Sequence, residues 1–406
     1  MKKIKYHLLI ALSGMAILSS CNKEPEQLPP VNVPAYPTGT ALAAAIAANV
    51  NDSLYSRIIT KSGLAATLND NTKTFTMFVP DNNALILSFG SLAGANAAIA
   101  SFSATTCAGI VQYNTVGLKL PSSSIGSAFP NFPYISQIVL DPTQPFIRMN
   151  IFPVKGTPYS YVNNIPVTAV DQTASNGIIH HVGALVAPPS ATLKTMIAAE
   201  ATLSYFRAAV ARADSGSTGL SKFDSLLNYG VTNMTVLAPN DNAFKTLVFG
   251  LAFQSYLATR PQPYTATDTA IATATGNGAV AAGPAFLSTN NVTTAQVKGI
   301  VAYHLLASLT SSTTTPYQPN IRVFSTNVPA TPTFIKTLVN GSVAIHPGVL
   351  AQATYTGPVV TALKVSSYGT FPSGGTPFSY SANAVTMDRH AVNGVYHIID
   401  KVLLPQ

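Results

Sequence analysis

Two stretches of this sequence repeat each other closely enough to limit the folds it can adopt. "NGIIHHVGALVAPP" begins at Asn176 and "NGVYHIIDKVLLP" begins at Asn393, so that His180 and His397 take the same place. Upstream, "TMFVPDNNAL" matches "TVLAPNDNAF", and "CAGIVQYNTV" matches "VKGIVAYHLL". Three markers in the same order in both halves indicate a duplicated domain and not a solenoid of short repeats.

The three markers resemble those of the fasciclin domain. "TVLAPNDNAF", "VAYHLL" and "NGVYHIID" look like its first conserved motif, its Tyr-His motif and its second conserved motif. The resemblance covers residues 40–189 and 190–406, which we expect to form two tandem domains. It implies an α+β fold in which helices pack on a wedge of β-sheets.

Local patterns agree with a mixed fold. Apolar residues at helical spacing in "SLYSRIITKSGLAATL" predict an amphipathic helix before the first marker. "FTMFVP" and "TVLAP" predict buried strands that end at Pro80 and Pro239. Asn176 and Asn393, each followed by glycine, predict turns, because Asn and Gly tolerate a left-handed backbone.

The two repeated histidines are predicted to be structural. On a strand, Val395, His397 and Ile399 share one face, and His180 is flanked in the same way. A lone histidine among the apolar residues of a repeated core motif favours a satisfied core residue over a catalytic or metal-binding one.

The Tyr-His marker gives the candidate binding residues. In animal fasciclin-domain proteins this region has been linked to cell adhesion, so the resemblance implies Tyr303, His304 and Tyr113 as adhesion or ligand-binding candidates. If the marker is helical, His304 lies on an apolar face, and packing is the alternative. Cys107 shares the equivalent face of the first copy, which favours a small buried hydrophobe over a reactive thiol.

The first residues, "MKKIKYHLLIALSGMAILSSC", predict an export signal over 1–20. A basic start and a short apolar run are typical of a secretory signal peptide, and the run is too short to span a bilayer. "LSSC" resembles the lipobox of bacterial lipoproteins, which implies lipidation of Cys21 and attachment to a membrane. An ordinary signal peptide with a chance cysteine is the alternative.

Residues 21–39 are rich in proline and predict an extended tether. Two glutamates lie just after Cys21, and this short acidic stretch resembles the surface-export signal of Bacteroidetes-type lipoproteins. We therefore expect a lipid-anchored outer-membrane protein at the cell surface, with the periplasmic face as the alternative.

The second copy is longer than the first, which predicts two insertions in it. One lies in "RPQPYTATDTAIATATGNGAVAAGPAF" and the other around "SSTTTPYQPNIRVFSTNVPATPTF". Both are rich in Thr, Ala, Gly and Pro, a composition that predicts loops.

Composition argues against several functions. Charged residues make up only 9% of the chain, and no cluster of Lys and Arg alternates with aromatics, so nucleic-acid binding is not expected. Outside the tether, Glu200 is the only glutamate, which leaves little for acid–base catalysis. There is no G-x-S-x-G or H-E-x-x-H motif, and His180-His181 lacks a metal-ligand partner at a recognisable spacing. We expect no enzyme, cofactor or metal.

These observations predict a non-catalytic, lipid-anchored envelope protein that mediates adhesion or ligand binding through fasciclin-like domains. Its partner would be a cell-surface protein or a glycan. The alternative is a surface glycan-binding accessory of a polysaccharide-uptake system, since the 17 tyrosines could stack on sugars, although the chain has no Trp. An envelope hydrolase would require a placed Asp or His.

Overall fold

In each half of the chain, a buried strand that ends in proline starts a sheet. The computed structural model describes residues 36–288, 292–307, 320–369 and 376–405, of which those from 39 onward belong to one compact unit. The expected signal peptide, Cys21 and the tether up to residue 35 lie outside the described residues, as does the start of the second insertion.

The first domain carries six of the described helices and eight strands. Its helices are α2 (Leu42–Ala48), α3 (Ser53–Ser62), α4 (Ala65–Leu68), α5 (Asn82–Phe89), α6 (Leu92–Ser101) and α7 (Ala104–Tyr113). Its strands are β1 (Phe75–Pro80), β2 (Thr115–Val116), β3 (Tyr134–Val139), β4 (Arg148–Ile151), β5 (Pro153–Val154), β6 (Tyr161–Val162), β7 (Ile165–Ala174) and β8 (Gly177–Val182).

The first sheet has the strand order β4-β3-β2-β1-β8-β7-β6-β5. Its centre is the parallel pair β1 and β8, and antiparallel arms extend from both sides of that pair. Met77 and Ile179 pack with the helices, whereas Phe78 and Val182 belong to a second core that also takes Val162 from the β6 arm. The two arms therefore form the expected wedge, and the central strands are buried on both faces.

The second domain repeats this plan. Its helices are α8 (Leu193–Ala199), α9 (Ser204–Ala213), α10 (Phe223–Asn228), α11 (Asp241–Leu257), α12 (Ala266–Ala281) and α13 (Thr294–Tyr303). Its strands are β9 (Met234–Pro239), β10 (Leu305–Leu306), β11 (Thr333–Ile335), β12 (Val349–Thr356), β13 (Val359–Ser366), β14 (Ser381–Ala391) and β15 (Gly394–Ile399).

The second sheet has the order β10-β9-β15-β14-β13-β12-β11, again with a parallel central pair, β9 and β15. Tyr396 and Ile398 pack toward the helices, and Ile399 packs into the other core. The predicted strands at both proline-ended markers are confirmed, as is the α+β fold in two tandem domains of one architecture.

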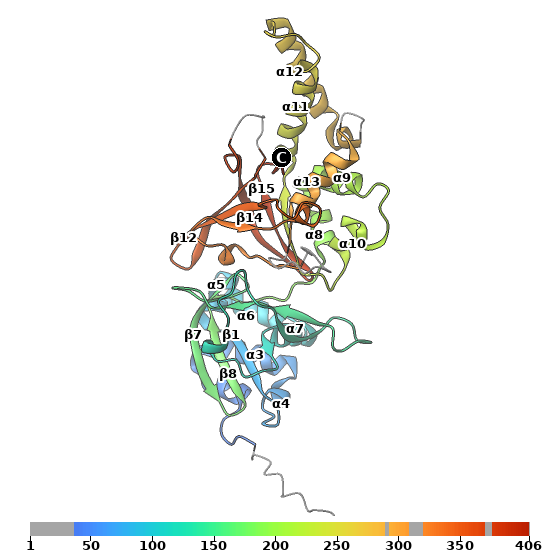
Figure 1. Cartoon of the computed structure of the whole chain (residues 1–406). Coiled ribbons are helices and arrows are strands. Elements are labelled where there is room, and N and C mark those ends of the chain that lie inside the picture. The colour runs from blue at the N-terminus through green and yellow to red at the C-terminus, as the bar shows by residue number, and fades with distance from the viewer. Residues whose placement is uncertain (1–35, 289–291, 308–319, 370–375, 406) are drawn as a thin grey trace, which may run out of the picture. The chain divides into compact units, whose positions relative to one another are not determined.

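The first insertion is helical, so the loop prediction was wrong there. α12 lies alongside α11, and Figure 1 shows the two as a hairpin that extends away from the second sheet. A capping box of Thr265 and Asp268 starts the helix. Gly276 permits the close approach of α12 to α11, because a Cβ there would lie 2.6 Å from the ring of Phe249.

The described part of the second insertion includes strand β11, so the loop prediction was also wrong in part there.

The helix predicted before the first marker is interrupted. α3 ends at Ser62, the next residue, Gly63, has a left-handed φ of 73°, and α4 follows as a separate short helix. Among the described residues, no single helix has the length and apolarity to cross a membrane, and one sharply bent pair, α5 with α6, meets the criterion of length and composition.

Candidate functional site

In the first domain, the repeated histidine is held by two backbone hydrogen bonds. The Nδ1 atom of His180 accepts the N–H of Asp171 (3.2 Å), which leaves the proton on Nε2 to donate to the carbonyl of Leu120 (2.9 Å). The carboxylate of Asp171 in turn accepts from the N–H and hydroxyl of Ser122. Burial lowers the pKa of His180, so the ring is neutral at pH 7 and stacks on Phe78.

The second domain contains the same network. Nδ1 of His397 accepts the N–H of Asp388 (3.3 Å), and Nε2 donates to the carbonyl of Val323 (3.0 Å). Asp388 accepts from the N–H and hydroxyl of Ser325. Each histidine thus links the last strand of its domain to the segment that contains its carbonyl partner, Leu120 in the first domain and Val323 in the second. Both are placed in the core, as the apolar flanks predicted.

The repeated asparagines fix the first helix of each domain to the last strand. Asn176 Oδ1 accepts the N–H of Leu42 (3.0 Å), and its Nδ2 donates to the carbonyls of Leu68 (2.9 Å) and Asp70 (3.2 Å). Asn393 makes the matching bonds in the second domain. Their amides satisfy buried backbone groups that would otherwise be unpaired.

The predicted turns are present, but the expected reason for them was wrong. Asp171 and Asp388, with φ of 62° and 58°, adopt the left-handed backbone, and the Asn-Gly pairs do not. The glycines serve close packing instead. A Cβ on Gly177 would lie 2.2 Å from the carbonyl oxygen of Phe75, and one on Gly394 would meet the same obstacle across β9.

His304 caps the helix of the Tyr-His marker in the second domain. Its Nδ1 donates to the carbonyl of Ile300 (2.8 Å), and its Nε2 accepts the N–H of Leu403 (2.9 Å). Asn114 takes this place in the first domain and donates to the carbonyl of Val186 (2.8 Å). Burial lowers the pKa of His304 to about 4, so it is neutral at physiological pH.

The two tyrosines of the marker also lie in the core. Tyr113 accepts a hydrogen bond from Nδ2 of Asn163 (3.1 Å), and Tyr303 donates to the carbonyl of Gly348 (2.7 Å) while accepting from the N–H of Tyr368. Burial raises the pKa of Tyr113 to about 12. Neither tyrosine nor His304 has exposed surface. Their adhesion role stays a prediction, and none of the three side chains is available for direct contact in this structure.

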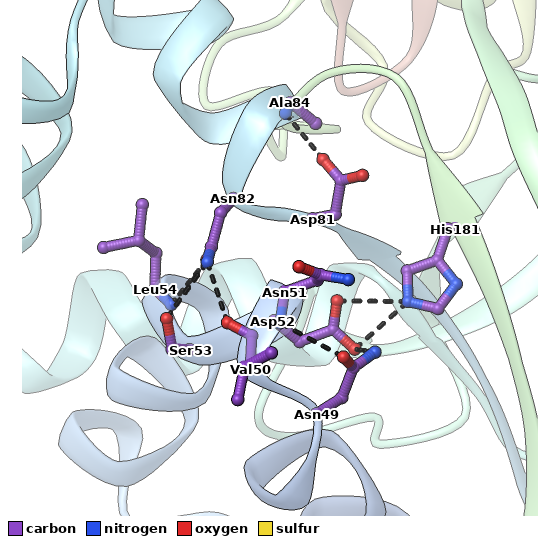
Figure 2. A network of polar contacts seen from close by, with 10 residues as sticks. All are labelled: Asn49, Val50, Asn51, Asp52, Ser53, Leu54, Asp81, Asn82, Ala84 and His181. Carbon is purple, nitrogen blue, oxygen red and sulfur yellow. Dashed lines mark hydrogen bonds and ion pairs between the residues drawn. The ribbon is translucent and has the colours of Figure 1, made fainter.

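A buried carboxylate and a histidine form an ion pair that the sequence analysis missed. Figure 2 shows Asp52, from the turn before α3, facing His181 on β8. Asp52 is fully buried and also accepts from Nδ2 of Asn49 (2.8 Å). The hydrogen bond to Asp52 raises the pKa of His181. Nearby, Asn82 accepts from the N–H of Leu54 and caps α3.

This pair occurs in the first domain only. Leu203 stands directly before α9, as Asp52 stands before α3, and Ile398 takes the place of His181 on the last strand. Both replacements belong to the apolar core of the second domain. The duplicated fold therefore accepts either an ion pair or an apolar pair at this position.

A second unpredicted feature is the buried cation Arg322, which has 2% of its surface exposed. Its guanidinium donates to Oδ1 of Asn233 (2.7 Å), Nε2 of His390 (2.8 Å) and the carbonyl of Val392 (3.0 Å). It also lies 4.7 Å from the ring centre of Phe152 in the first domain. Burial lowers its pKa to about 10, which leaves it charged at pH 7.

In the described ranges, no three His, Cys, Asp or Glu side chains come close enough to share a metal ion. Cys107 is buried, at the place of Val297. The repeated histidines and asparagines of the last marker, and the aspartates before them, are engaged in bonds that hold the fold together.

A family match covers most of the first domain. Residues 52–188 match the fasciclin domain family. Among solved structures, a FAS1 domain pair from the insect cell adhesion molecule fasciclin I is similar, with 12% identity over 86% of this chain and 95% of that chain and a TM-score of 0.30. No curated protein matches the sequence.

The class of fold follows from the first domain and its repetition. The first domain matches the fasciclin family, and the second reproduces its central strand pair, its His-Asp-Ser network and its asparagine bonds. The chain is a tandem pair of domains of one architecture, and the first of them matches the fasciclin domain family.

Proposed function

We propose that this protein is a non-catalytic binding protein whose fasciclin-like domains mediate adhesion or capture a ligand at a cell envelope. The observation that carries the proposal is the fasciclin match together with the internal use of the repeated polar residues. Binding then falls to the loops and exposed surfaces, where few charges are available to steer a partner.

The adhesion proposal is tested by competition. Purified chain, added to cells that display the protein, should inhibit their attachment to one another or to a coated surface. A chain that lacks residues 260–286 tests whether the enlarged second domain is the contact surface. Unchanged attachment after this deletion, in a folded variant, would exclude the hairpin as the contact.

We further propose that lipid on Cys21 anchors the protein to the outer membrane with its domains outside the cell, as the lipobox-like "LSSC" and the acidic tether suggest. Protease treatment of intact cells should then remove the second domain, and Cys21→Ala should shift the protein out of the membrane fraction. Protection until the outer membrane is permeabilised would place it in the periplasm.

A surface glycan-binding accessory of polysaccharide uptake is the second candidate. One observation favours it over adhesion to a protein: a pocket with several tyrosines in its wall lies where the two domains meet.

A further inference from the structure

A pocket of about 620 Å³ lies between loops of the first domain and the segment that precedes β11. This volume is in the range of sites that take small ligands. The first domain contributes residues 127–130, 154–159 and 161, and the second contributes residues 326, 327, 329, 330, 355 and 357. The pocket therefore exists only where both domains are present.

Aromatic rings form the fixed walls of this pocket. Tyr355 donates its hydroxyl to the carbonyl of Val328 (2.6 Å), and Tyr161 donates to the carbonyl of Pro358 (3.0 Å). Because both hydroxyls are engaged, the rings keep one orientation. Tyr159 completes the wall and is 39% exposed, so its ring can be covered by a ligand.

Uncommitted hydrogen-bonding groups surround these rings. Ser127, Lys155, Thr157 and Tyr159 line the pocket, and their side-chain hydroxyl and ammonium groups have no hydrogen-bond partner in the part of the chain that the structure describes. Asn327 also lines the pocket, but its Nδ2 group is covered by neighbouring protein atoms and is not available to a ligand.

We propose that this pocket binds a carbohydrate chain, which rests on the tyrosine rings and exchanges hydrogen bonds with the free hydroxyls. A sugar offers an apolar face to an aromatic ring and many hydroxyl groups at its edge, which is the complement of this wall. Lys155 is the one charged side chain that lines the pocket, so a phosphate-rich ligand finds no second cation there. This assignment names the ligand class of the binding function proposed above and rests on it.

The test uses the full chain purified in detergent, on an array of neutral and acidic glycans. Affinity for retained oligosaccharides is then measured by calorimetry and by tyrosine emission, which is unobscured because the chain has no Trp. Tyr159→Ala should weaken binding by about tenfold or more, as loss of a central aromatic anchor does. Tyr159→Phe, which keeps the ring, should retain most of the affinity.

Tyr264→Ala is the matched control. Tyr264 is 38% exposed, close to the exposure of Tyr159, but it does not line the pocket, so its loss should leave the affinity unchanged. Equal losses for the two alanine variants, or no loss for Tyr159→Ala, would overturn the assignment. So would the absence of any retained glycan.

Cell attachment separates this inference from the proposed function. If Tyr159→Ala loses glycan binding and attachment together, both proposals are supported. If the chain supports attachment but the array retains nothing, or a proline-rich peptide binds in place of a sugar, the carbohydrate assignment fails and the binding function stands. If neither attachment nor any glycan binding is found, both fail.

Discussion

The Nε2 atom of His181 lies 3.1 Å from both carboxylate oxygens of Asp52, and the carboxylate has no exposed surface. The bond raises the pKa of His181 above its ordinary value of 6.5. A raised folded-state pKa means that the protonated ring stabilises the fold below about pH 6.5, and that this contribution is lost as the pH rises through the folded-state value.

Comparison of wild type with His181→Gln isolates that contribution from the other histidines. The difference between their free energies of unfolding, from urea denaturation, should be larger at pH 6 than at pH 8. Asp52→Asn should remove the pH dependence of the difference. A difference that is the same at both pH values would show that the pair is not charged.

In the second domain, Leu203 and Ile398 take the places of Asp52 and His181. This apolar replacement predicts how the ion pair of the first domain responds to substitution. His181→Ile should destabilise the protein by about 3 kcal/mol, because it leaves the carboxylate of Asp52 buried without its cation. The double variant Asp52→Leu/His181→Ile copies Leu203 and Ile398 and should recover most of that loss. A double variant less stable than His181→Ile would contradict this.

His304 predicts a loss of stability in acid. Its pKa is about 4 in the folded protein and 6.5 ordinarily, so the unfolded chain binds the proton more readily. Stability should fall as the pH drops from about 6.5 to 4, with a contribution of about 3 kcal/mol from this residue. His304→Asn, which places the first domain's residue there, should reduce the difference between the unfolding free energies at pH 7 and pH 4.

Loss of the repeated asparagine should be costly. Asn393→Ala leaves the N–H of Leu193 and the carbonyls of Leu227 and Tyr229 without their partner, and should destabilise by about 2–4 kcal/mol. The exposed Asn51, whose side chain makes no hydrogen bond in the described structure, supplies the control. Asn51→Ala should change the free energy of unfolding, measured by thermal denaturation for both variants, by less than about 0.5 kcal/mol.

Two glycines of α12 should respond oppositely to alanine. Nothing lies within 4 Å of a Cβ at Gly278, so Gly278→Ala should stabilise by about 0.5–1 kcal/mol through helix propensity alone. A Cβ at Gly276 would lie 2.6 Å from Phe249, so Gly276→Ala should destabilise the hairpin. Thermal unfolding monitored by circular dichroism measures both, and equal gains would mean that α12 does not pack on α11.

The duplicated fold could be predicted from the sequence because the markers consist of residue types with a fixed structural use. A strand before Pro80 and a histidine among apolar neighbours carry the same meaning in both halves. The pair of Asp52 and His181 could not be predicted, since 129 residues separate the partners and the second half has no equivalent. The segment around α12 is rich in Thr, Ala, Gly and Pro, a composition that predicts a loop, although Thr265 and Asp268 provided a capping signal for a helix.

The position of β15 has a consequence for how the protein is made. It follows every other strand of its sheet along the chain, yet it lies between β9 and β14. During synthesis, β9 emerges from the ribosome long before its parallel partner, and the Asn393 amide that fixes α8 comes equally late. The second domain therefore cannot close its core until residue 399 is translated, and a chaperone that shields the exposed edge of β9 would act in that interval.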